Sequence, residues 1–364
     1  MRSGRPDEEH ALLPHANHAN AILQMGCICF TCCENQVGLS MRILVSGAQG
    51  FVGRYLVAAL RSSGTRSEVF PTSRNAAVDP MLGLVERMDV VDGASVDTVI
   101  ARIRPTHIVH LAGLSVIAAA TANEDLAWQV HLFGTLNIAR AIKRHAPQCV
   151  LLSIGSGQIY GTTGRSGEAL DEMALVAPTN VQMASKAAAD LALGAMAEEG
   201  LRCVRFRPFN HTGPNQSEKF VLPDFAMQIA RIKAGRQSPL MRVGNLNAER
   251  DFLDVRDVAM AYVLAVEKSE CIEPGTVFNI ASGVPRRIRD LLDEMIRMSG
   301  ASVVIEADTG RVRPGDIPRF VGDASRARRV LGWTPNYSLA TTMRDILDHA
   351  DQLVRKGTGS PQER

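Results

Sequence analysis

The feature that most constrains this chain is a glycine-rich turn that joins a short apolar run to an amphipathic one, in the stretch MRILVSGAQGFVGRYLVAALRSSG. Residues 43–45 favour a buried strand, and the segment after the turn has helical periodicity that ends at Gly64. Between them, Gly47, Gly50 and Gly53 have the spacing G-x-x-G-x-x-G. The first glycine permits a tight turn, the second lets the backbone approach a pyrophosphate, and the third lets helix and strand pack closely. This order predicts a dinucleotide-binding βαβ unit.

Apolar and helical segments continue to alternate after this unit. We expect strands at 67–73, at 107–113 and within CVLLSIGSGQIYG, and helices at 94–103 and 126–141. The low aromatic content of 5% and the many aliphatic residues suit a parallel sheet that helices cover on both faces. The pattern predicts an α/β fold, a Rossmann-type doubly wound parallel sheet whose ligands bind at the carboxyl ends of its strands.

Charge and composition exclude several other classes. The formal net charge of +2 gives no strong field for nucleic acid or a membrane surface. No apolar run approaches the roughly 18 to 20 residues that span a bilayer. The seven cysteines form no disulfide framework, so a reducing cytoplasm is the expected location. No motif typical of a serine triad is present, and no metal site is expected.

The first forty residues differ from the rest of the chain. They are polar, contain His10, His15, His18 and the cluster CICFTCC, and show no helical or strand period. The cluster fits no paired C-x-x-C frame, which makes zinc binding the less favoured interpretation. Residues 1–40 are therefore expected to be a disordered extension or a misassigned start, with Met41 as the functional beginning.

The end of the second expected strand bears on the choice of dinucleotide. An NAD site usually has an Asp or Glu there, but this chain has Thr72, Ser73 and Arg74. A guanidinium beside hydroxyls suits a 2′-phosphate, so NADP is favoured over NAD. Asp89 follows a later strand and is a candidate acceptor for the adenine amino group. His110 lies within an apolar strand, where a packed core histidine is favoured over a catalytic base.

Five motifs in one order resemble those of the extended short-chain dehydrogenases/reductases: the glycine triplet, HLAG, SIGSGQIYG, the helix with Lys186, and FRPFNHTGPNQ. The resemblance covers residues 41 to about 350. Within it, RPFNHTGP, QIARIKAG and ERDFLDVRDVAMAY resemble the GDP-4-dehydro-6-deoxy-D-mannose reductases and the neighbouring GDP-mannose 4,6-dehydratases. The resemblance implies that the dinucleotide is bound by Gly47, Gln49, Gly50, Phe51, Val52, Gly53, Arg74, Asp89, Val90, Leu111, Ala112, Gly113, His131, Lys186 and Phe209.

The resemblance also implies a reacting centre with a Ser or Thr hydroxyl, a Tyr and a Lys. Ser156 and Lys186 match the first and the third, but Gln182 stands where the Tyr is expected. A neutral amide can donate a hydrogen bond to a ketone but cannot pass on a proton. Three interpretations stay open: slow reduction with a proton from Lys186 or water, a binding protein without useful catalysis, or proton transfer by His131, which replaces the usual Asn.

Gln158 separates two branches of the family. The dehydratases have a Glu at this place as the base that eliminates water, and an amide cannot ionise. The resemblance therefore implies NAD(P)H-dependent reduction of the 4-keto group of GDP-4-dehydro-6-deoxy-D-mannose to GDP-D-rhamnose, also called GDP-6-deoxy-D-mannose. The alternatives are another nucleotide-sugar epimerase or dehydratase, and a catalytically impaired nucleotide-sugar-binding protein.

The second half of the chain is expected to bind a GDP-linked keto-deoxy sugar. Arginine suits a diphosphate because its planar guanidinium binds two oxygens at once. The family pattern assigns the sugar nucleotide to Ser156, Asn210, Lys219, Val221, Arg250 and Arg313.

The expected organisation has a dinucleotide-binding Rossmann domain at 41–208 and a smaller C-terminal substrate-binding lobe mainly at 209–350, followed by a tail at 351–364. The RDFLDV and FNIASG segments are expected to cross back to the first domain. The helices around 126–141 and 183–196 resemble those of a four-helix interface, so a homodimer is expected.

Overall fold

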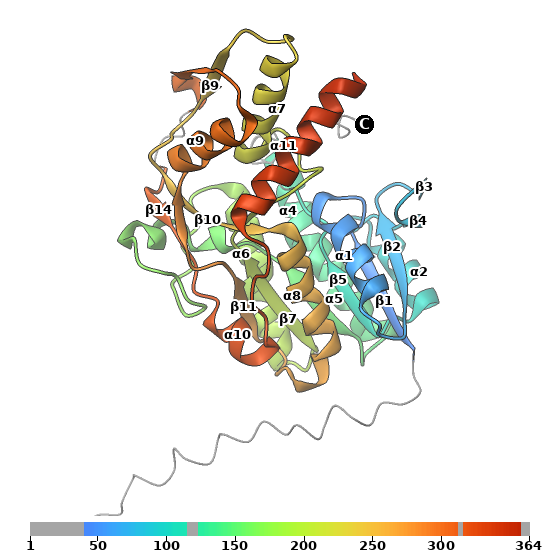
Figure 1. The fold of residues 1–364 in the computed structure, drawn as a ribbon. Helices are drawn as coiled ribbons and strands as arrows, with labels where there is room; N and C mark the ends of the chain where they lie inside the picture. Colours follow the sequence, from blue (N-terminus) through green and yellow to red (C-terminus); the bar gives the residue numbers. More distant parts are fainter. Residues whose placement is uncertain (1–39, 115–122, 312–315, 358–364) are drawn as a thin grey trace, which may run out of the picture. The chain divides into compact units, whose positions relative to one another are not determined.

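The computed structural model describes residues 40–114, 123–311 and 316–357 (Figure 1). Its largest element is an eight-stranded sheet with the strand order β11-β7-β6-β5-β1-β2-β4-β3. Its pairs are parallel except β3 with β4, which is antiparallel. The order extends from β1 in both directions, which is the doubly wound arrangement that the sequence predicts. The strands are β1 (Met41–Ser46), β2 (Ser67–Ser73), β3 (Ala77–Asp79), β4 (Gly83–Arg87), β5 (His107–His110), β6 (Val150–Ile154), β7 (Cys203–Pro208) and β11 (Val277–Ile280).

Helices cover both faces of this sheet. Successive side chains of a strand point to opposite faces, and in these strands both sets are apolar. In β1, Val45 belongs to the hydrophobic core on one face and Leu44 to the core on the other. The helices of the first face are α1 (Phe51–Ser62) and α8 (Val255–Glu267). Those of the second are α2 (Gly93–Ile103), α5 (Gly134–His145) and α6 (Val181–Glu198).

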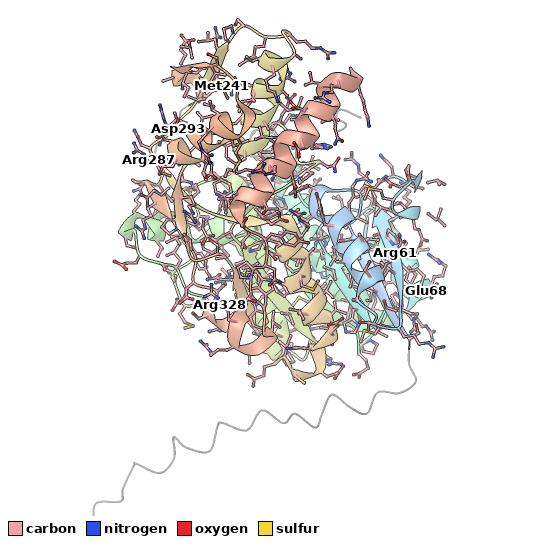
Figure 2. All side chains as sticks on the ribbon, in the orientation of Figure 1. Arg61, Glu68, Met241, Arg287, Asp293 and Arg328 are labelled. Atoms are coloured by element: carbon pink, nitrogen blue, oxygen red, sulfur yellow. The ribbon has the colours of Figure 1, made fainter. Side chains whose placement is uncertain are left out.

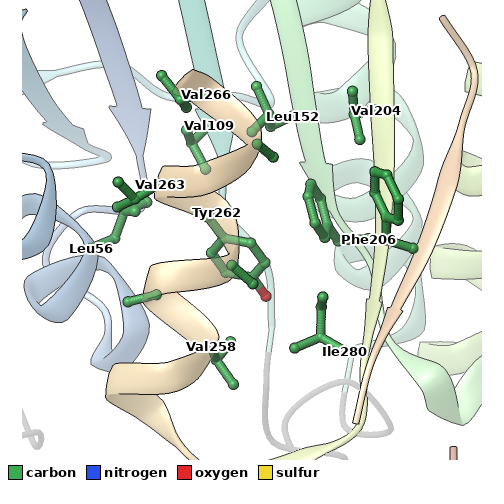
Figure 3. Close-up of a cluster of buried hydrophobic side chains, with 14 of the residues drawn as sticks. Leu56, Val109, Leu152, Val204, Phe206, Val258, Tyr262, Val263, Val266 and Ile280 are labelled. Carbon is green, nitrogen blue, oxygen red and sulfur yellow. The ribbon is translucent and has the colours of Figure 1, made fainter. Parts of the chain in front are cut away.

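The core beneath α8 shows how the later part of the chain returns to the first. Figure 3 shows Val258 and Tyr262 of α8 facing the sheet residues Leu152 and Phe206. The rings of Tyr262 and Phe206 meet edge to face, with centroids 5.0 Å apart. Burial of each such side chain contributes about 1.5 to 3 kcal/mol. Since α8 and β11 both follow residue 209, the second half of the chain is shared between the two parts of the fold.

The smaller lobe forms around a separate hydrophobic core, between α7 (Val221–Lys233), α9 (Ile288–Ser299) and α11 (Leu339–Lys356). One small sheet pairs β9 (Leu240–Val243) with β13 (Val304–Ala307). The other contains β8 (Asn210–Thr212), β10 (Glu249–Asp254), β12 (Pro285–Arg287) and β14 (Arg319–Phe320). Figure 2 labels Met241 and Asp293 on this lobe, away from Arg61 and Glu68 of the main sheet region. Short connections are the 3-10 turns η3 (Ser269–Cys271) and η4 (Thr309–Arg311) and the helix α10 (Ser325–Leu331).

Several boundaries differ from the sequence prediction. The RDFLDV strand, β10, pairs with β8, β12 and β14, and its Leu253 belongs to the hydrophobic core of the main sheet. The FNIASG strand, β11, pairs with β7 in the main sheet. β6 ends at Ile154, because the chain beyond it forms the 3-10 segment η2 (Gly157–Ser166). The expected tail after residue 350 begins as helix, since α11 continues to Lys356.

The helix expected at 126–141 consists of three pieces. These are α4 (Glu124–Trp128), the π-helical turn η1 (Gln129–Phe133) and α5. A π-helical turn is rare and frequently marks a functional site. None of the described helices is long and apolar enough to cross a membrane.

Candidate active site

The glycine turn after β1 has the geometry that the sequence predicts. Gly47 has a φ of +70°, and a Cβ at this position would lie 2.8 Å from the nitrogen of Ala112. A Cβ on Gly53 would lie 2.5 Å from the carbonyl oxygen of Ala48, so this glycine lets α1 approach the turn. α1 begins after Gly50 without a side-chain cap. Its first N–H groups therefore face outward as an anion site that fits a pyrophosphate.

The start of α1 also contacts the second half of the chain. The rings of Phe51 and His211 stack with their planes 2° apart and their centroids 6.2 Å apart. Tyr55 donates a hydrogen bond to the carbonyl of Pro214 at 2.9 Å. Gln49 and Val52, two further expected dinucleotide contacts, lie in the turn and in the first turn of α1. These contacts join the glycine turn to the segment that begins the smaller lobe.

The residues expected to bind the adenosine part lie at the ends of β2 and β4. Arg74 is exposed directly after β2. Thr72 is buried and its hydroxyl donates to a backbone carbonyl of β1 at 3.2 Å, so Arg74 is the better placed of the two to meet a phosphate. One oxygen of Asp89 accepts from the N–H of Val91 at 3.1 Å, and Val90 is buried beside α5.

A cavity lies at the carboxyl ends of β5 and β6, where a doubly wound sheet binds its ligands. Leu111, Ala112 and Gly113 line it from the segment after β5, and Gly155 lines it from the segment after β6. Lys186 of α6 contributes to the lining, and its Nζ donates to the carbonyl of Gly155 at 3.4 Å. Burial lowers the pKa of Lys186 from 10.5 to about 8. Lys186 is therefore a cation near neutral pH that releases its proton more readily than an ordinary lysine.

Ser156 follows the cavity lining and is the N-cap of η2. Its Oγ accepts a hydrogen bond from the N–H of Gln158 at 3.1 Å. A hydroxyl that accepts in this way still has its hydrogen to donate to a carbonyl oxygen. The side chain of Gln158 is exposed, and as a neutral amide it cannot serve as the base of a dehydration.

Gln182 is buried on α6, one turn before Lys186, so the two side chains leave the helix on the same side. Its Nε2 donates to the carbonyl of Leu114 at 2.6 Å. Its Oε1 is buried and has no hydrogen-bond partner within the part of the chain that the structure describes. At the expected Tyr position, the NH2 group of Gln182 therefore has a hydrogen-bond partner, and its side-chain oxygen has none among the described residues.

His131 lies in the π-helical turn η1 and also binds the backbone of Leu114. Its Nε2 accepts from the N–H of Leu114 at 2.9 Å, and its Nδ1 lies 2.8 Å from the hydroxyl of Ser185. Ser185 donates to the backbone carbonyl of Gln182, so the proton of the ring is on Nδ1. Burial and the charge of Lys186 lower the pKa of His131 to about 3. The ring is thus neutral and has a partner on each nitrogen.

His110 is the packed core histidine that the sequence favours. Its Nδ1 lies 2.7 Å from the hydroxyl of Ser46, and its Nε2 lies 3.1 Å from the hydroxyl of Thr135. Burial lowers its pKa from 6.5 to about 4.

The expected sugar-nucleotide residues that the structure describes are not among those that line this cavity. Asn210 is half-buried in β8, while Lys219 and Val221 stand at the start of α7. The guanidinium of Arg250 donates to the carbonyls of Glu249 and Ile317, and it pairs with Asp316. Arg313 lies outside the described residues. Phe209, expected to bind the dinucleotide, packs against Gly157 and the ring of Phe320. These assignments stay predictions.

A buried ion pair behind Lys186 was not predicted from the sequence. Asp190 lies one turn after Lys186, and its carboxylate binds the guanidinium of Arg207 at 2.7 Å. Arg207 also donates to the hydroxyl of Tyr160, which donates in turn to Asn279 of β11. The network attaches α6 to three elements of the main sheet region and so fixes the helix that positions Lys186.

Taken with the fold, this edge of the sheet places the protein among the extended short-chain dehydrogenases/reductases. The model of the family described as GDP-mannose 4,6 dehydratase matches residues 44–346. The GDP-6-deoxy-D-mannose reductase of Pseudomonas aeruginosa is 32% identical over 319 residues, which are 87% of this chain and 100% of that protein. The GDP-6-deoxy-D-talose 4-dehydrogenase of Aggregatibacter actinomycetemcomitans is 29% identical over 85% of this chain and 96% of its own. The chain therefore belongs to the GDP-mannose 4,6 dehydratase family.

Solved structures agree with this assignment. The structure of RMD from Pseudomonas aeruginosa complexed with NADPH has a TM-score of 0.76 and 31% identity, and the match covers 86% of this chain and 99% of that one. The Thermus thermophilus UDP-glucose 4-epimerase in complex with NAD has a TM-score of 0.74 and 26% identity, over 85% of this chain and 99% of that one.

Proposed function

We propose that this protein reduces the 4-keto group of GDP-4-dehydro-6-deoxy-D-mannose to GDP-6-deoxy-D-mannose, with NADPH preferred over NADH. The observation that carries the proposal is the cavity at the ends of β5 and β6, where Lys186 lies beside Gly155 and Ser156 follows directly. The 32% identity to a GDP-6-deoxy-D-mannose reductase supports the substrate. A relative's structure with NADPH and the exposed Arg74 support the dinucleotide.

The described residues fit a nicotinamide dinucleotide. The close approach at Gly47 leaves no room for a side chain, and the uncapped start of α1 suits the pyrophosphate. Arg74 suits a 2′-phosphate because a guanidinium binds two phosphate oxygens at once. When bound, the reduced dinucleotide supplies the hydride of the reaction.

Lys186 is the source of the proton in this proposal. Reduction of a ketone adds a hydride to the carbonyl carbon and a proton to the oxygen, and Gln182 has no proton to give. Ser156 donates a hydrogen bond that polarises the ketone. The Lys186 ammonium transfers its proton to the oxygen and the resulting amine regains one from water. Because the pKa of Lys186 is about 8, this transfer is easier than from an ordinary lysine.

Gln158 supports reduction over dehydration. Elimination of water needs a base beside the sugar, and Gln158 stands at the place where the dehydratases of this family have their Glu. Reduction needs no such base. We therefore propose a reductase and not a 4,6-dehydratase.

The test is a direct assay with the keto-sugar nucleotide and NADPH. We expect loss of the absorbance of the reduced nicotinamide and a product heavier by two hydrogens. Gln182 favours a second candidate, a sugar-nucleotide-binding protein without useful catalysis. No absorbance change above background, together with saturable binding of both ligands, would favour that candidate and contradict the reductase.

A homodimer is also proposed. Phe133 at the end of η1 and Leu191 of α6 are apolar side chains that are 50% and 59% exposed, respectively. They lie on two of the segments expected to pair with a second copy. Sedimentation of the protein and of a Leu191→Glu variant tests this, and a monomeric parent protein would contradict it.

A further inference from the structure

Gln182 and His131 stand at two positions where the resemblance to the family implies other residues, and both bind the backbone of Leu114, one on each of its two peptide groups. His131 Nε2 accepts from the N–H of Leu114 at 2.9 Å, and Gln182 Nε2 donates to the carbonyl of Leu114 at 2.6 Å. Ser185 joins the two, because it accepts from His131 Nδ1 and donates to the backbone carbonyl of Gln182. The two residues and Ser185 thus form one hydrogen-bonded unit around Leu114.

This unit fixes the orientation of the Gln182 amide. The carbonyl of Leu114 can only accept, so the amide must present its NH2 group to it. A rotated amide would place two acceptor oxygens 2.6 Å apart. The carbonyl oxygen of the amide is therefore the atom left without a partner in the described residues, and the side chain is 98% buried. A buried acceptor of this kind is costly unless a ligand satisfies it.

We propose that Gln182 Oε1 accepts a hydrogen bond from a hydroxyl of the ligand that binds beside Lys186. Gln182 then meets the ligand as an acceptor, the opposite of a residue that donates to a ketone. His131 is a positioning residue, since it holds the backbone N–H of Leu114, the residue whose carbonyl orients the amide. The proposal rests on the function proposed above for the identity of the ligand, which is either the nicotinamide ribose or the sugar. The two sources share one chemistry, an alcohol donor.

The test measures binding without turnover, by titration calorimetry on the full chain. Four ligands are compared: NADPH, its analogue without the 2′-hydroxyl on the nicotinamide ribose, GDP-mannose, and its 3-deoxy analogue. GDP-mannose has no ketone, so a failure of the proposed reduction leaves this test intact. The wild-type protein should bind one of the two deoxy ligands about tenfold more weakly than its parent. The pair that shows the loss identifies the source of the hydroxyl.

Gln182→Met removes the acceptor with little change of size. It should bind the parent ligand about tenfold more weakly than wild type and no longer distinguish it from the deoxy analogue. Gln148→Met, at an exposed position remote from the cavity, is the matched control and should behave as wild type. Two results would overturn the proposal. In the first, Gln182→Met prefers the parent ligand over the deoxy ligand as strongly as wild type does. In the second, neither protein distinguishes the two ligands.

Two further variants keep the test decisive if Gln182→Met does not fold. Gln182→Glu retains an acceptor oxygen and should retain discrimination against the deoxy ligand. His131→Asn retains a side-chain acceptor for the Leu114 N–H and should preserve discrimination, whereas His131→Leu should reduce it. Identical discrimination in His131→Leu and wild type would show that His131 does not position the amide.

Discussion

The turn after β1 and the peptide after β5 lie on neighbouring strands of one sheet, yet they are built on different principles. At the first, Gly47 and Gly53 act by having no side chain, and the backbone makes the site. At the second, the side chains of His131 and Gln182 hold Leu114. The first has the glycine spacing that the sequence predicts, whereas at the second Gln182 and His131 stand where the resemblance to the family implies a Tyr and an Asn. The comparison teaches that a site made by the backbone depends on where side chains are absent, whereas a site made by side chains depends on which ones meet.

The largest expected effect concerns Lys186, which lines the cavity together with the segment after β5. Lys186→Arg keeps the positive charge but gives a group that does not release its proton. We expect reduction to fall by roughly a hundred- to ten-thousand-fold, with NADPH binding changed only a few-fold. Steady-state kinetics measure the rate of reduction, and fluorescence titration measures the affinity for NADPH. A variant that reduces the ketone at the wild-type rate would exclude Lys186 as the proton source.

Gln182→Tyr sharpens the comparison in the other direction. It restores a phenol one turn before Lys186, where a positioned acid contributes roughly a hundred- to ten-thousand-fold. Part of this gain is offset by loss of the Leu114 hydrogen bond, so we expect kcat to rise at least about tenfold. Gln182→Phe is the control without a hydroxyl. Equal rates for the Tyr and Phe variants would show that another group already supplies the proton.

A substitution of Arg74 tests dinucleotide binding separately from catalysis. Arg74→Ala removes the guanidinium after β2, so the dissociation constant for NADPH should rise about tenfold while that for NADH changes less than about twofold. Arg61→Ala, on the exposed face of α1, is the control. Equal weakening for both dinucleotides would mean that Arg74 does not meet the 2′-phosphate.

The smallest expected effect is on stability. Burial lowers the pKa of His107 and His110 to about 4 and that of His131 to about 3, from an ordinary 6.5. As the pH falls below about 6.5 the unfolded chain binds protons that the folded chain does not, so stability is lost down to about pH 4. At pH about 5.5 each histidine should cost about 1 kcal/mol. Denaturant unfolding of His107→Gln, remote from the cavity, should show a smaller loss between pH 7 and about 5.5. If the variant loses as much stability as wild type over this pH range, a lowered pKa of His107 does not contribute to the loss.

The sequence predicts the two regions unequally, for a physical reason. Strand β2 falls at 67–73 as expected and the glycine turn has the expected geometry, because local spacing determines a strand and a tight turn. The meeting of Gln182 and His131 at Leu114 was not predicted, because it depends on three segments that only the folded sheet brings together. The π-helical turn that carries His131 has no periodicity of its own to reveal it.

The dependence of kcat on pH tests the central claim most directly, which is that Lys186 and not Gln182 gives the proton. With saturating NADPH and keto-sugar nucleotide, kcat should be constant near pH 7 and fall tenfold per unit above the pKa of Lys186, about 8, as the ammonium is lost. A kcat that stays constant or rises through this range, in a protein that still binds both ligands, would contradict the account.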